Sequence, residues 1–483
     1  MVAMSQHPLA RCLGLAGSIM IAVTAFFGGA LPAMGDDPTP VGLWRSDGGP
    51  AAIGLWFAGL AALGGAWWML RRNVPSLRWA YVTIALWSLP LLVAPPLASR
   101  DVYAYACQGA TWAAGFNPYE QGVAALPCPW LESISPIWQD TPAPYGPFFV
   151  LISGLLVSAG WSLAANVVLF RLVAVAGVVL TAACLPALAR RCGVPPQQAV
   201  WLALASPLVG VHLISGAHND ALMIGLLVAG LTVIVSRPGR AGPLLAGGAL
   251  LGLAVAIKAT AVVVVPFAVL AGLAGSLRLA DLLRAGAQVV GAAVATLVAV
   301  TVAGGLSFGW VTGLASSSDA VGWTSPPTAV GQTLGYLPRA FGIRIDLIPY
   351  TRQVGLAVLA VLLVWLWWRV WRRGRDPLHG AALALAATVA LSPVFHPWYA
   401  LWPLALLAVT VRDRIGWFTG VALGASFLVF ANGVALARYT KIPGAPLMTL
   451  AVIAVTVHLV RAARRDAAVA ADPVPRTVED PVA

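Results

Sequence analysis

Two ionisable residues stand at places in the sequence where a charge is costly. Asp101 directly follows an apolar segment, and Lys258 lies between two apolar stretches. An ionisable residue at membrane depth is expensive, so it is by default a hypothesis for a functional site. A carboxylate can act as a general base, and an ammonium can stabilise a departing phosphate. Two alternatives stay open: Asp101 could be a solvated loop charge or pair with Arg100, and Lys258 could extend to the membrane interface.

Two polar turns between apolar segments offer further candidates. The first is Ser-Gly-Ala-His-Asn-Asp, which ends in His218, Asn219 and Asp220. These side chains could contact a phosphate, a metal or a sugar, or they could simply form a turn, which Asn and Asp favour. The second turn contains His396, which can exchange a proton near neutral pH or can be structural.

Three other features could belong to a site. Arg171 lies inside an apolar run, where it could pair with a phosphate or extend to the interface. The segment Ala143–Phe148 contains two prolines, which stop a helix from continuing, so it either turns a loop back into the bilayer or begins a plain helix. The loop before it is rich in Tyr, Trp, Asn and Pro and includes Gly115–Tyr119. The sequence contains no P-loop, no dinucleotide fingerprint and no Cys/His zinc spacing.

The elements that position these residues are predicted to be membrane helices. The chain has 483 residues, of which 60% are hydrophobic and 10% charged, whereas soluble domains carry about 25% charged residues. Apolar runs of about 20 residues recur along the whole chain, and each can cross about 30 Å of hydrocarbon. We therefore expect an all-α polytopic membrane protein and not a soluble enzyme. The predicted apolar segments span residues 13–33, 51–70, 77–98, 166–189, 196–214, 220–236, 243–257, 259–275, 286–305, 352–368, 379–392, 398–410, 415–432 and 445–460.

These segments are expected to form one membrane domain, residues 1–465, with about 13–14 transmembrane helices. The shorter stretch 146–162 is predicted as a re-entrant or interfacial helix, with a full span as the alternative. Residues 13–33 could be a signal peptide, but the run is long for one and lacks an A-x-A site, which favours a retained helix. Residues 466–483 are rich in Pro, Ala and charge and are expected to form a disordered cytoplasmic tail.

The arginines indicate how the chain is oriented in the membrane. The net charge is +12, but the arginines sit in short clusters between apolar segments, which argues against nucleic acid as a partner. Basic residues in short loops mark the cytoplasmic side. With the N-terminus inside, every strongly basic loop falls on that side. The opposite side then holds two long loops, 99–145 and 306–351, and the turns that contain His218 and His396.

The first long loop could carry a crosslink. Cys107 and Cys128 both fall in it, and an oxidising compartment outside the cytoplasm would allow a disulfide bond. The sequence alone leaves open whether they form one.

All of these candidate groups fall on the non-cytoplasmic side in this orientation. A site there cannot use cytoplasmic nucleotide sugars, because they do not cross the bilayer. The donor must be membrane-borne, and a polyprenyl phosphate sugar fits. Its transfer needs a base for the acceptor hydroxyl, for which Asp101 is suited, and a cation for the phosphate, for which Lys258 is suited.

The sequence resembles a known family. It is similar to the GT-C glycosyltransferase superfamily, in which an Asp begins the first large outer loop, and more closely to the actinobacterial polyprenol-phosphomannose-dependent α-(1→6)-mannosyltransferases. The resemblance runs in order over residues 99–403. The motifs that carry it are Ser99–Tyr103, Gly115–Tyr119, Thr141–Pro147, His218–Asp220, Lys258 and Pro397–Tyr399.

The resemblance implies a GT-C-like bundle in the plasma membrane that moves mannose from polyprenyl-phosphate-mannose to a growing, lipid-anchored α-(1→6)-mannan of lipomannan and lipoarabinomannan. The donor of the family is β-linked and the product α-linked, so a single inverting displacement with Asp101 as the base is implied. Lys258, His218 and Arg171 would bind the donor phosphate. No cofactor is expected, and a divalent metal is possible but not predicted. The implied substrate-binding residues are Arg100, Tyr103, Asn117, Tyr119, Tyr145, Asn219, Asp220, His396, Trp398 and Tyr399.

Three other functions remain possible from the sequence. An arabinofuranosyltransferase that uses polyprenyl-phosphate-arabinose would share the architecture, and no residue separates the two sugars. A transporter or flippase for a lipid-linked glycan is a second alternative, although such proteins often show internal repeats and a site at the bilayer midplane. A non-catalytic scaffold is the third.

Overall fold

The computed structural model describes residues 2–471 except 34–36, 38, 127, 276–277, 317–319 and 414. Within these residues the chain is helical throughout, and the pairing between Val429 and Ala435 is an isolated bridge and not a strand. The prediction of an all-α protein is therefore confirmed.

Most helices follow one another along the chain with short connections, and the longest connection joins α5 to α6. The α-helices are α1 (Val2–Gly28), α2 (Pro40–Arg45), α3 (Gly49–Met69), α4 (Leu77–Val93), α5 (Asp101–Ala113), α6 (Pro147–Ala159), α7 (Leu163–Arg191), α8 (Pro196–Leu204), α9 (Asp220–Ser236), α10 (Ala241–Val255), α11 (Val265–Ala271), α12 (Leu279–Ala303), α13 (Trp310–Ser316), α14 (Pro326–Arg339), α15 (Ile348–Arg373), α16 (Pro377–Leu391), α17 (Leu401–Thr410), α18 (Ile415–Ala425) and α19 (Lys441–Ala471). The 3₁₀ turns are η1 (Val123–Ala125), η2 (Leu131–Ser133), η3 (Pro136–Trp138), η5 (Ala259–Val264), η7 (Pro397–Ala400) and η8 (Leu436–Arg438), and η4 (Val209–Ser215) is a π-helix.

The multi-pass organisation is confirmed. Among the described residues, six helices are long and apolar enough to cross a membrane, or up to seven when the bent pair α8–η4 counts as one span, and eight shorter apolar helices accompany them. The fourteen predicted apolar segments lie on the six long helices, on the bent pair and on seven of the shorter helices. The remaining short helix, α6, has 13 residues and coincides with the stretch predicted as re-entrant or interfacial.

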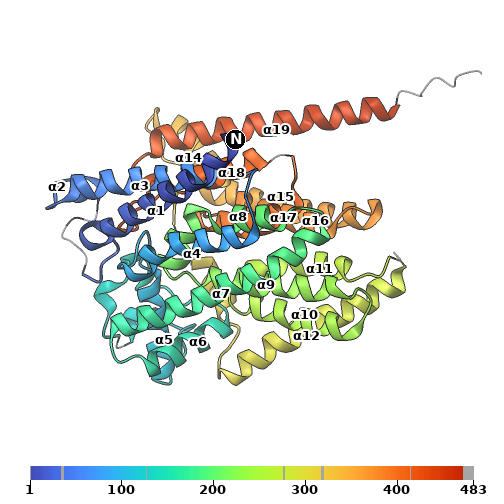
Figure 1. The fold of residues 1–483 in the computed structure, drawn as a ribbon. Coiled ribbons are helices and arrows are strands. Elements are labelled where there is room, and N and C mark those ends of the chain that lie inside the picture. The colour runs from blue at the N-terminus through green and yellow to red at the C-terminus, as the bar shows by residue number, and fades with distance from the viewer. Residues whose placement is uncertain are drawn as a thin grey trace, which may run out of the picture.

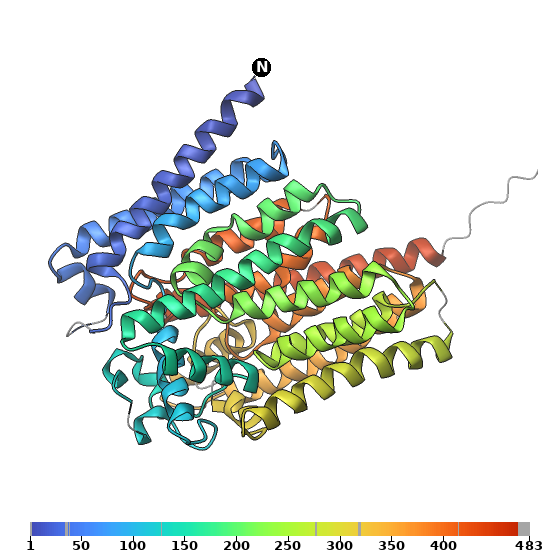
Figure 2. The same ribbon diagram turned by 60° about the horizontal axis from the view of Figure 1, so that its bottom comes forward.

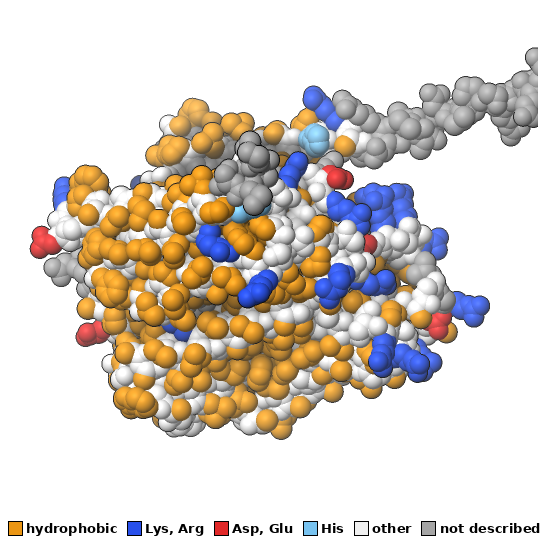
Figure 3. Space-filling model, in the orientation of Figure 1, with side chains coloured by type: hydrophobic (Ala, Val, Ile, Leu, Met, Phe, Trp, Pro, Cys, Tyr) orange, Lys and Arg blue, Asp and Glu red, His pale blue; other side chains and the backbone are white. Residues whose placement is uncertain are grey.

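The helices lie roughly side by side, with the ends of the bundle at left and right in Figure 1. Helices α7, α9, α10 and α12 pack in that order as a row, which Figure 2 also shows. Helices α16 and α17 pack against each other, and α19 rests on α14 at the edge of the bundle. Lys and Arg side chains gather on the right-hand half of the face in Figure 3, whereas α5 and α6 lie at lower left in Figure 1.

Both predicted outer loops contain helices. The first, 99–145, contains α5 and the turns η1 to η3, and most of α5 is buried. The second, 306–351, contains α13 and α14. At the other end of the chain, α19 continues to Ala471, so it includes the start of the predicted tail, and the rest of that tail lies outside the described residues.

The question of the crosslink is answered by the structure: Cys107 and Cys128 form a disulfide bond with their Cα atoms 5.5 Å apart. It ties α5 to the segment before η2. Replacing both cysteines with Ser should destabilise the fold by about 3 kcal/mol, because a crosslink restricts the unfolded chain. The melting temperature in detergent should fall by the same amount in the double variant and in reduced wild-type protein. A melting temperature of the wild type that does not respond to reductant would contradict this, and Cys184→Ser is the matched control.

Candidate active site

The candidate site forms where four irregular stretches of backbone meet. These are the start of α5 with Asp101, the turn between η4 and α9 with His218, the break between α10 and η5 with Lys258, and the segment before η7 with His396. Asp101 contacts His218, His218 contacts Trp398, and Lys258 contacts Asp220, so the four stretches are linked. The structure therefore brings together residues that the sequence places far apart.

The position of Asp101 is set by the backbone before it. Ala98 has a positive φ of 60°, which costs a residue with a side chain roughly 1–3 kcal/mol and persists only where the surroundings hold it. Its backbone N–H donates to the carbonyl of Ala431, 2.7 Å away. Asp101 then starts α5, and its own N–H donates to the Ser99 hydroxyl at 3.1 Å. A carboxylate at a helix N-terminus is favoured by the helix dipole.

His218 is held by a second strained turn. Ala217 has a φ of 52°, and the His218 backbone N–H donates to the carbonyl of His212 in η4, 3.2 Å away. The His218 side chain is fully buried, and its Nδ1 lies 3.6 Å from Oδ2 of Asp101. Neither ring nitrogen of His218 has a hydrogen-bond partner among the described residues, and the same is true of the buried side chain of Asn219. Buried polar groups without partners are uncommon and call for an explanation, such as a ligand.

Lys258 occupies a break in what the sequence presents as two successive apolar segments. Helix α10 ends at Val255, and Lys258 has an extended backbone with φ −147° and ψ 121° before η5 begins. The break frees backbone carbonyls, and the segment before α6 satisfies them: Gly146 N–H donates to Ile257 at 3.0 Å and Phe148 N–H to Ala256 at 2.9 Å. A Cβ on Gly146 would lie 2.4 Å from the backbone of Ala256, so only glycine allows this approach. The proline-rich motif that contains Tyr145 thus docks onto the break.

Lys258 is paired with Asp220. Its Nζ lies 2.9 Å from Oδ1 and 3.0 Å from Oδ2 of this fully buried carboxylate. The Trp402 indole N–H donates to the same Oδ1 at 2.6 Å. The ammonium also lies 4.8 Å from the ring centre of Tyr399 and 5.1 Å from that of Trp402, within cation–π range. Asp220, predicted to bind substrate, therefore serves in this structure as the counterion of Lys258.

Three imidazoles surround Trp398. The ring of His396 stacks on it at 4.6 Å, that of His218 lies at 4.1 Å, and that of His212 lies at 5.1 Å. Only 6% of Trp398 is exposed, so little of its surface is left for a sugar. The imidazole rings contribute aromatic contacts and, through the unpartnered nitrogens of His218 and His212, polar atoms that face the interior.

The electrostatics favour an ionised base beside neutral imidazoles. Burial raises the pKa of Asp101 to about 6, while its bond with Ser99 and the charge of Lys258 oppose the rise. Burial also lowers the pKa of His218 well below its usual range and that of His396 to about 4. Near neutral pH, Asp101 can therefore accept a proton and the two imidazoles are uncharged. A base whose pKa lies near the working pH suits general base catalysis.

The pKa of Asp101 leads to a testable pH dependence. Because the base must be deprotonated to act, kcat/KM of the enzyme should be constant above pH 7 and fall as the pH drops through about 6. Tyr105, Tyr145, Asp220 and Lys258 also face this carboxyl, so the midpoint reports their combined field. The measurement is a pH–rate profile of the purified protein. An activity that is unchanged well below pH 6 would contradict the assignment.

Several predicted site residues use their polar atoms to hold the surrounding backbone. Arg100 donates to carbonyls in the segment after α1 and in η2. The Tyr103 hydroxyl donates to the carbonyl of Ala30 at 2.7 Å. Arg171 donates to a carbonyl of α4 and, through two nitrogens, to that of Ser215 at the end of η4. These three side chains support the loops that carry Asp101 and His218.

Asn117 and Tyr119 lie in the segment between α5 and η1, which contacts the segment before α6. The Asn117 side chain donates to Glu120 at 3.1 Å, and the Tyr119 hydroxyl donates to the carbonyl of Tyr145 at 2.9 Å. Tyr145 itself packs edge-on against the ring of Tyr105 at 5.1 Å. Burial raises the pKa of both Tyr105 and Tyr145, and the negative charge of Asp101 adds to the rise in each.

The sequence motifs did not single out His212 or Trp402. Trp402 lies three residues after Tyr399, a spacing that places two side chains on one face of a helix, and their rings stack at 4.2 Å. That spacing could have identified Trp402 from the sequence. His212 gave no comparable signal, because a histidine in an apolar run is usually structural.

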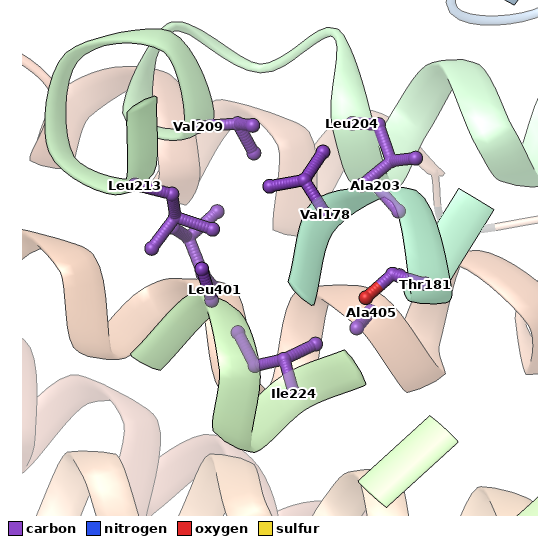
Figure 4. Close-up of a pocket in the computed structure, with 10 residues that line it drawn as sticks. Val178, Thr181, Ala203, Leu204, Val209, Leu213, Ile224, Leu401 and Ala405 are labelled. Atoms are coloured by element: carbon purple, nitrogen blue, oxygen red, sulfur yellow. The ribbon is translucent and has the colours of Figure 1, made fainter. Parts of the chain in front are cut away.

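A cavity lies apart from these polar residues. The cavity in Figure 4 lies between α7, α8, η4, α9 and α17, and an apolar cavity of this kind stays dry. Its lining is aliphatic apart from Thr181: Val178, Ala203, Leu204, Val209, Leu213, Ala221, Ile224, Leu401 and Ala405. Within the described part of the chain, no group of three or more His, Cys, Asp or Glu side chains is placed to hold a metal ion.

Fold and site together define a multi-pass membrane enzyme, and comparison with known families makes this specific. A family model described as alpha-(1->6)-mannopyranosyltransferase, N-terminal domain, matches residues 11–274, and one described as MptB C-terminal domain matches residues 327–461. The chain belongs to the alpha-(1->6)-mannopyranosyltransferase family and is therefore a hexosyltransferase. The resemblance found in the sequence is confirmed.

Individual relatives agree with the family models. An alpha-(1->6)-mannopyranosyltransferase of Mycobacterium tuberculosis is 31% identical over 92% of this chain and 86% of its own length. Alpha-(1->6)-mannopyranosyltransferase A of the same organism is 34% identical over 69% of this chain and 65% of its own length. Alpha-(1->6)-mannopyranosyltransferase B of Corynebacterium glutamicum is 29% identical over 88% of this chain and 77% of its own length. No solved structure matches.

Proposed function

We propose that the protein transfers mannose from polyprenyl-phosphate-mannose to a growing, lipid-anchored α-(1→6)-mannan of the lipomannan and lipoarabinomannan type. The observation that carries this proposal is that the largely buried carboxylate of Asp101 lies 3.6 Å from His218, and that Asp220, two residues further along the same turn, binds Lys258 at 2.9 Å. A sugar phosphate donor needs both a carboxylate and a cation, one for the acceptor hydroxyl and one for the phosphate. The relatives named above are mannopyranosyltransferases that form this linkage.

The reaction is a single displacement at the anomeric carbon. The acceptor 6-hydroxyl gives its proton to Asp101 while its oxygen forms the new bond to C1. The bond between C1 and the phosphate oxygen breaks, and its electron pair stays on that oxygen, where the ammonium of Lys258 stabilises the charge. Attack from the face opposite the phosphate inverts the anomeric carbon. His218 lies 3.6 Å from the carboxylate of Asp101. Its imidazole can therefore contact the base as well as the donor phosphate.

We place the site on the extracytoplasmic face. Two observations support this orientation. The disulfide bond of Cys107 and Cys128 lies in the segment that Asp101 begins, and disulfides persist in oxidising compartments. The visible Lys and Arg side chains gather away from α5 and α6, and basic loops face the cytoplasm.

The orientation can be tested with single cysteines for a membrane-impermeant thiol reagent. In a variant without its three free cysteines, Cys12, Cys184 and Cys192, a cysteine at Asp140 should react in intact cells. A cysteine at Arg375 should react only after the membrane is opened. The reverse pattern would place the site in the cytoplasm and overturn the use of a lipid-linked donor on the outer face.

The alternative functions are distinguished by which sugar donor the protein uses and by whether sugar is transferred at all. Purified protein in lipid should transfer mannose from polyprenyl-phosphate-mannose and not arabinose from polyprenyl-phosphate-arabinose. Transfer of arabinose alone would replace the proposal with an arabinofuranosyltransferase. Movement of lipid-linked glycan across vesicles without transfer would indicate a flippase, and neither activity in folded protein would indicate a scaffold.

A further inference from the structure

Trp402 in α17 is the residue that completes the surroundings of Lys258. Its indole N–H donates to Oδ1 of Asp220 at 2.6 Å, across 182 positions of sequence. Its ring stacks on that of Tyr399 at 4.2 Å, and both rings face the ammonium of Lys258. Trp402 itself is 3% exposed, so it does not meet a substrate directly.

The hydrogen bonds between Lys258 and the other described residues leave at least one donor free. An ammonium has three N–H groups, and its two contacts with Asp220, at 2.9 Å and 3.0 Å, occupy at most two of them. The Lys258 side chain is 13% exposed, whereas that of Asp220 is completely buried. The third N–H is therefore the one that can reach a ligand, and its direction depends on how the carboxylate is turned.

The Asp220 carboxylate needs a fixed orientation. The terminal torsion of an Asp side chain has a broad energy profile, so the carboxylate can rotate unless something holds it. The Trp402 N–H binds one of its two oxygens and removes this freedom. Rotation of the carboxylate would carry the ammonium with it, because both oxygens bind Nζ.

We propose that Trp402 is a positioning residue for the donor phosphate: it fixes the Asp220 carboxylate, and the carboxylate aims the free N–H of Lys258 at the phosphate. The inference rests on the proposed function, in which Lys258 binds that phosphate. It assigns Asp220 and Trp402 to the support of the cation, and it gives a tryptophan outside the recognised motifs a defined role.

The test is Trp402→Phe, which keeps an aromatic ring over the ammonium and removes the N–H. The KM for polyprenyl-phosphate-mannose and the Kd for polyprenyl phosphate, measured without turnover, should both rise about tenfold, in line with the loss of a hydrogen bond to a charged group. The kcat should also fall, because the ammonium of Lys258 meets more negative charge on the phosphate during the reaction than in the bound donor. Trp67→Phe is the matched control, since Trp67 is also buried and its N–H donates to a carbonyl, that of Trp201, at 3.1 Å.

A second comparison shows whether Trp402 acts through Lys258. In protein that already carries Lys258→Met and Asp220→Asn, adding Trp402→Phe should not change the Kd for polyprenyl phosphate further, because coupled residues are non-additive. Trp402→His, which keeps a ring N–H, should hold the KM and Kd closer to the wild-type values than Trp402→Phe does, and should stay close to them even if Trp402→Phe does not fold. An unchanged donor KM and Kd, or effects that add fully to the Lys258 change, would overturn the inference. Wild-type protein without any mannose transfer would instead overturn the proposed function.

Discussion

Asp101→Asn is expected to lower kcat by about 100- to 10,000-fold, the range that a positioned general base contributes. The amide fills the same space and leaves the hydrogen bond from the backbone N–H of residue 101 to Ser99 in place, but it cannot take a proton from the acceptor hydroxyl. Binding of polyprenyl phosphate should be unchanged within about twofold. The measurements are steady-state transfer of mannose and equilibrium binding, with the folded state checked by the melting temperature.

The control for this prediction is Asp140→Asn. Asp140 lies in the same segment between α4 and α6 but is exposed, so its amide should leave both turnover and stability as they are. Full turnover in Asp101→Asn would remove Asp101 from the role of base. The nearest alternative would then be His218, the imidazole 3.6 Å away.

Changes at Lys258 are expected to separate stability from activity. Lys258→Met leaves the buried carboxylate of Asp220 without its ion partner, and breaking a buried pair in this way costs about 3–5 kcal/mol. Adding Asp220→Asn removes that uncompensated charge and should recover most of the melting temperature. Activity should not recover, because the donor phosphate has lost its cation.

The two variants are compared by melting temperature in detergent and by the donor KM. Donor use in the double variant should stay at least about tenfold weaker than in the wild type, the scale of one charged hydrogen bond. Recovery of a normal donor KM together with stability would mean that Lys258 only balances Asp220. Lys441→Met is a suitable control, since Lys441 starts α19 at the edge of the bundle.

The membrane architecture could be predicted because the bilayer imposes it directly. Apolar runs separated by clusters such as Arg71 and Arg72, or Arg190 and Arg191, define spans and loops without knowledge of how the helices pack. The breaks within apolar segments were harder to predict, because each break requires another part of the chain to donate hydrogen bonds to the freed carbonyls. The interruption before η5 exists because the segment around Gly146 bonds to it, and a contact of that kind cannot be predicted from hydropathy.

The site was predictable in part for a similar reason. Asp101 and Lys258 stand out because a charge beside an apolar run is costly. Their partners do not stand out: Asp220 lies 38 positions from Lys258, and Trp402 lies 182 positions from Asp220. Arg171 stood out in the same way as Lys258, yet its guanidinium donates to backbone carbonyls at helix ends. Such carbonyls lack intrahelical partners, so a buried arginine can serve the fold as well as a phosphate.

The central claim is tested most directly by one transfer experiment. Purified protein in lipid is given polyprenyl-phosphate-[¹⁴C]mannose and a short α-(1→6)-mannoside, in parallel with the Asp101→Asn variant and with GDP-[¹⁴C]mannose as the alternative donor. We expect label to move to the acceptor only with the wild type and only from the lipid-linked donor, and the product to carry the α-anomer. Transfer from GDP-mannose, equal transfer by Asp101→Asn, or no transfer by folded wild-type protein would contradict the account.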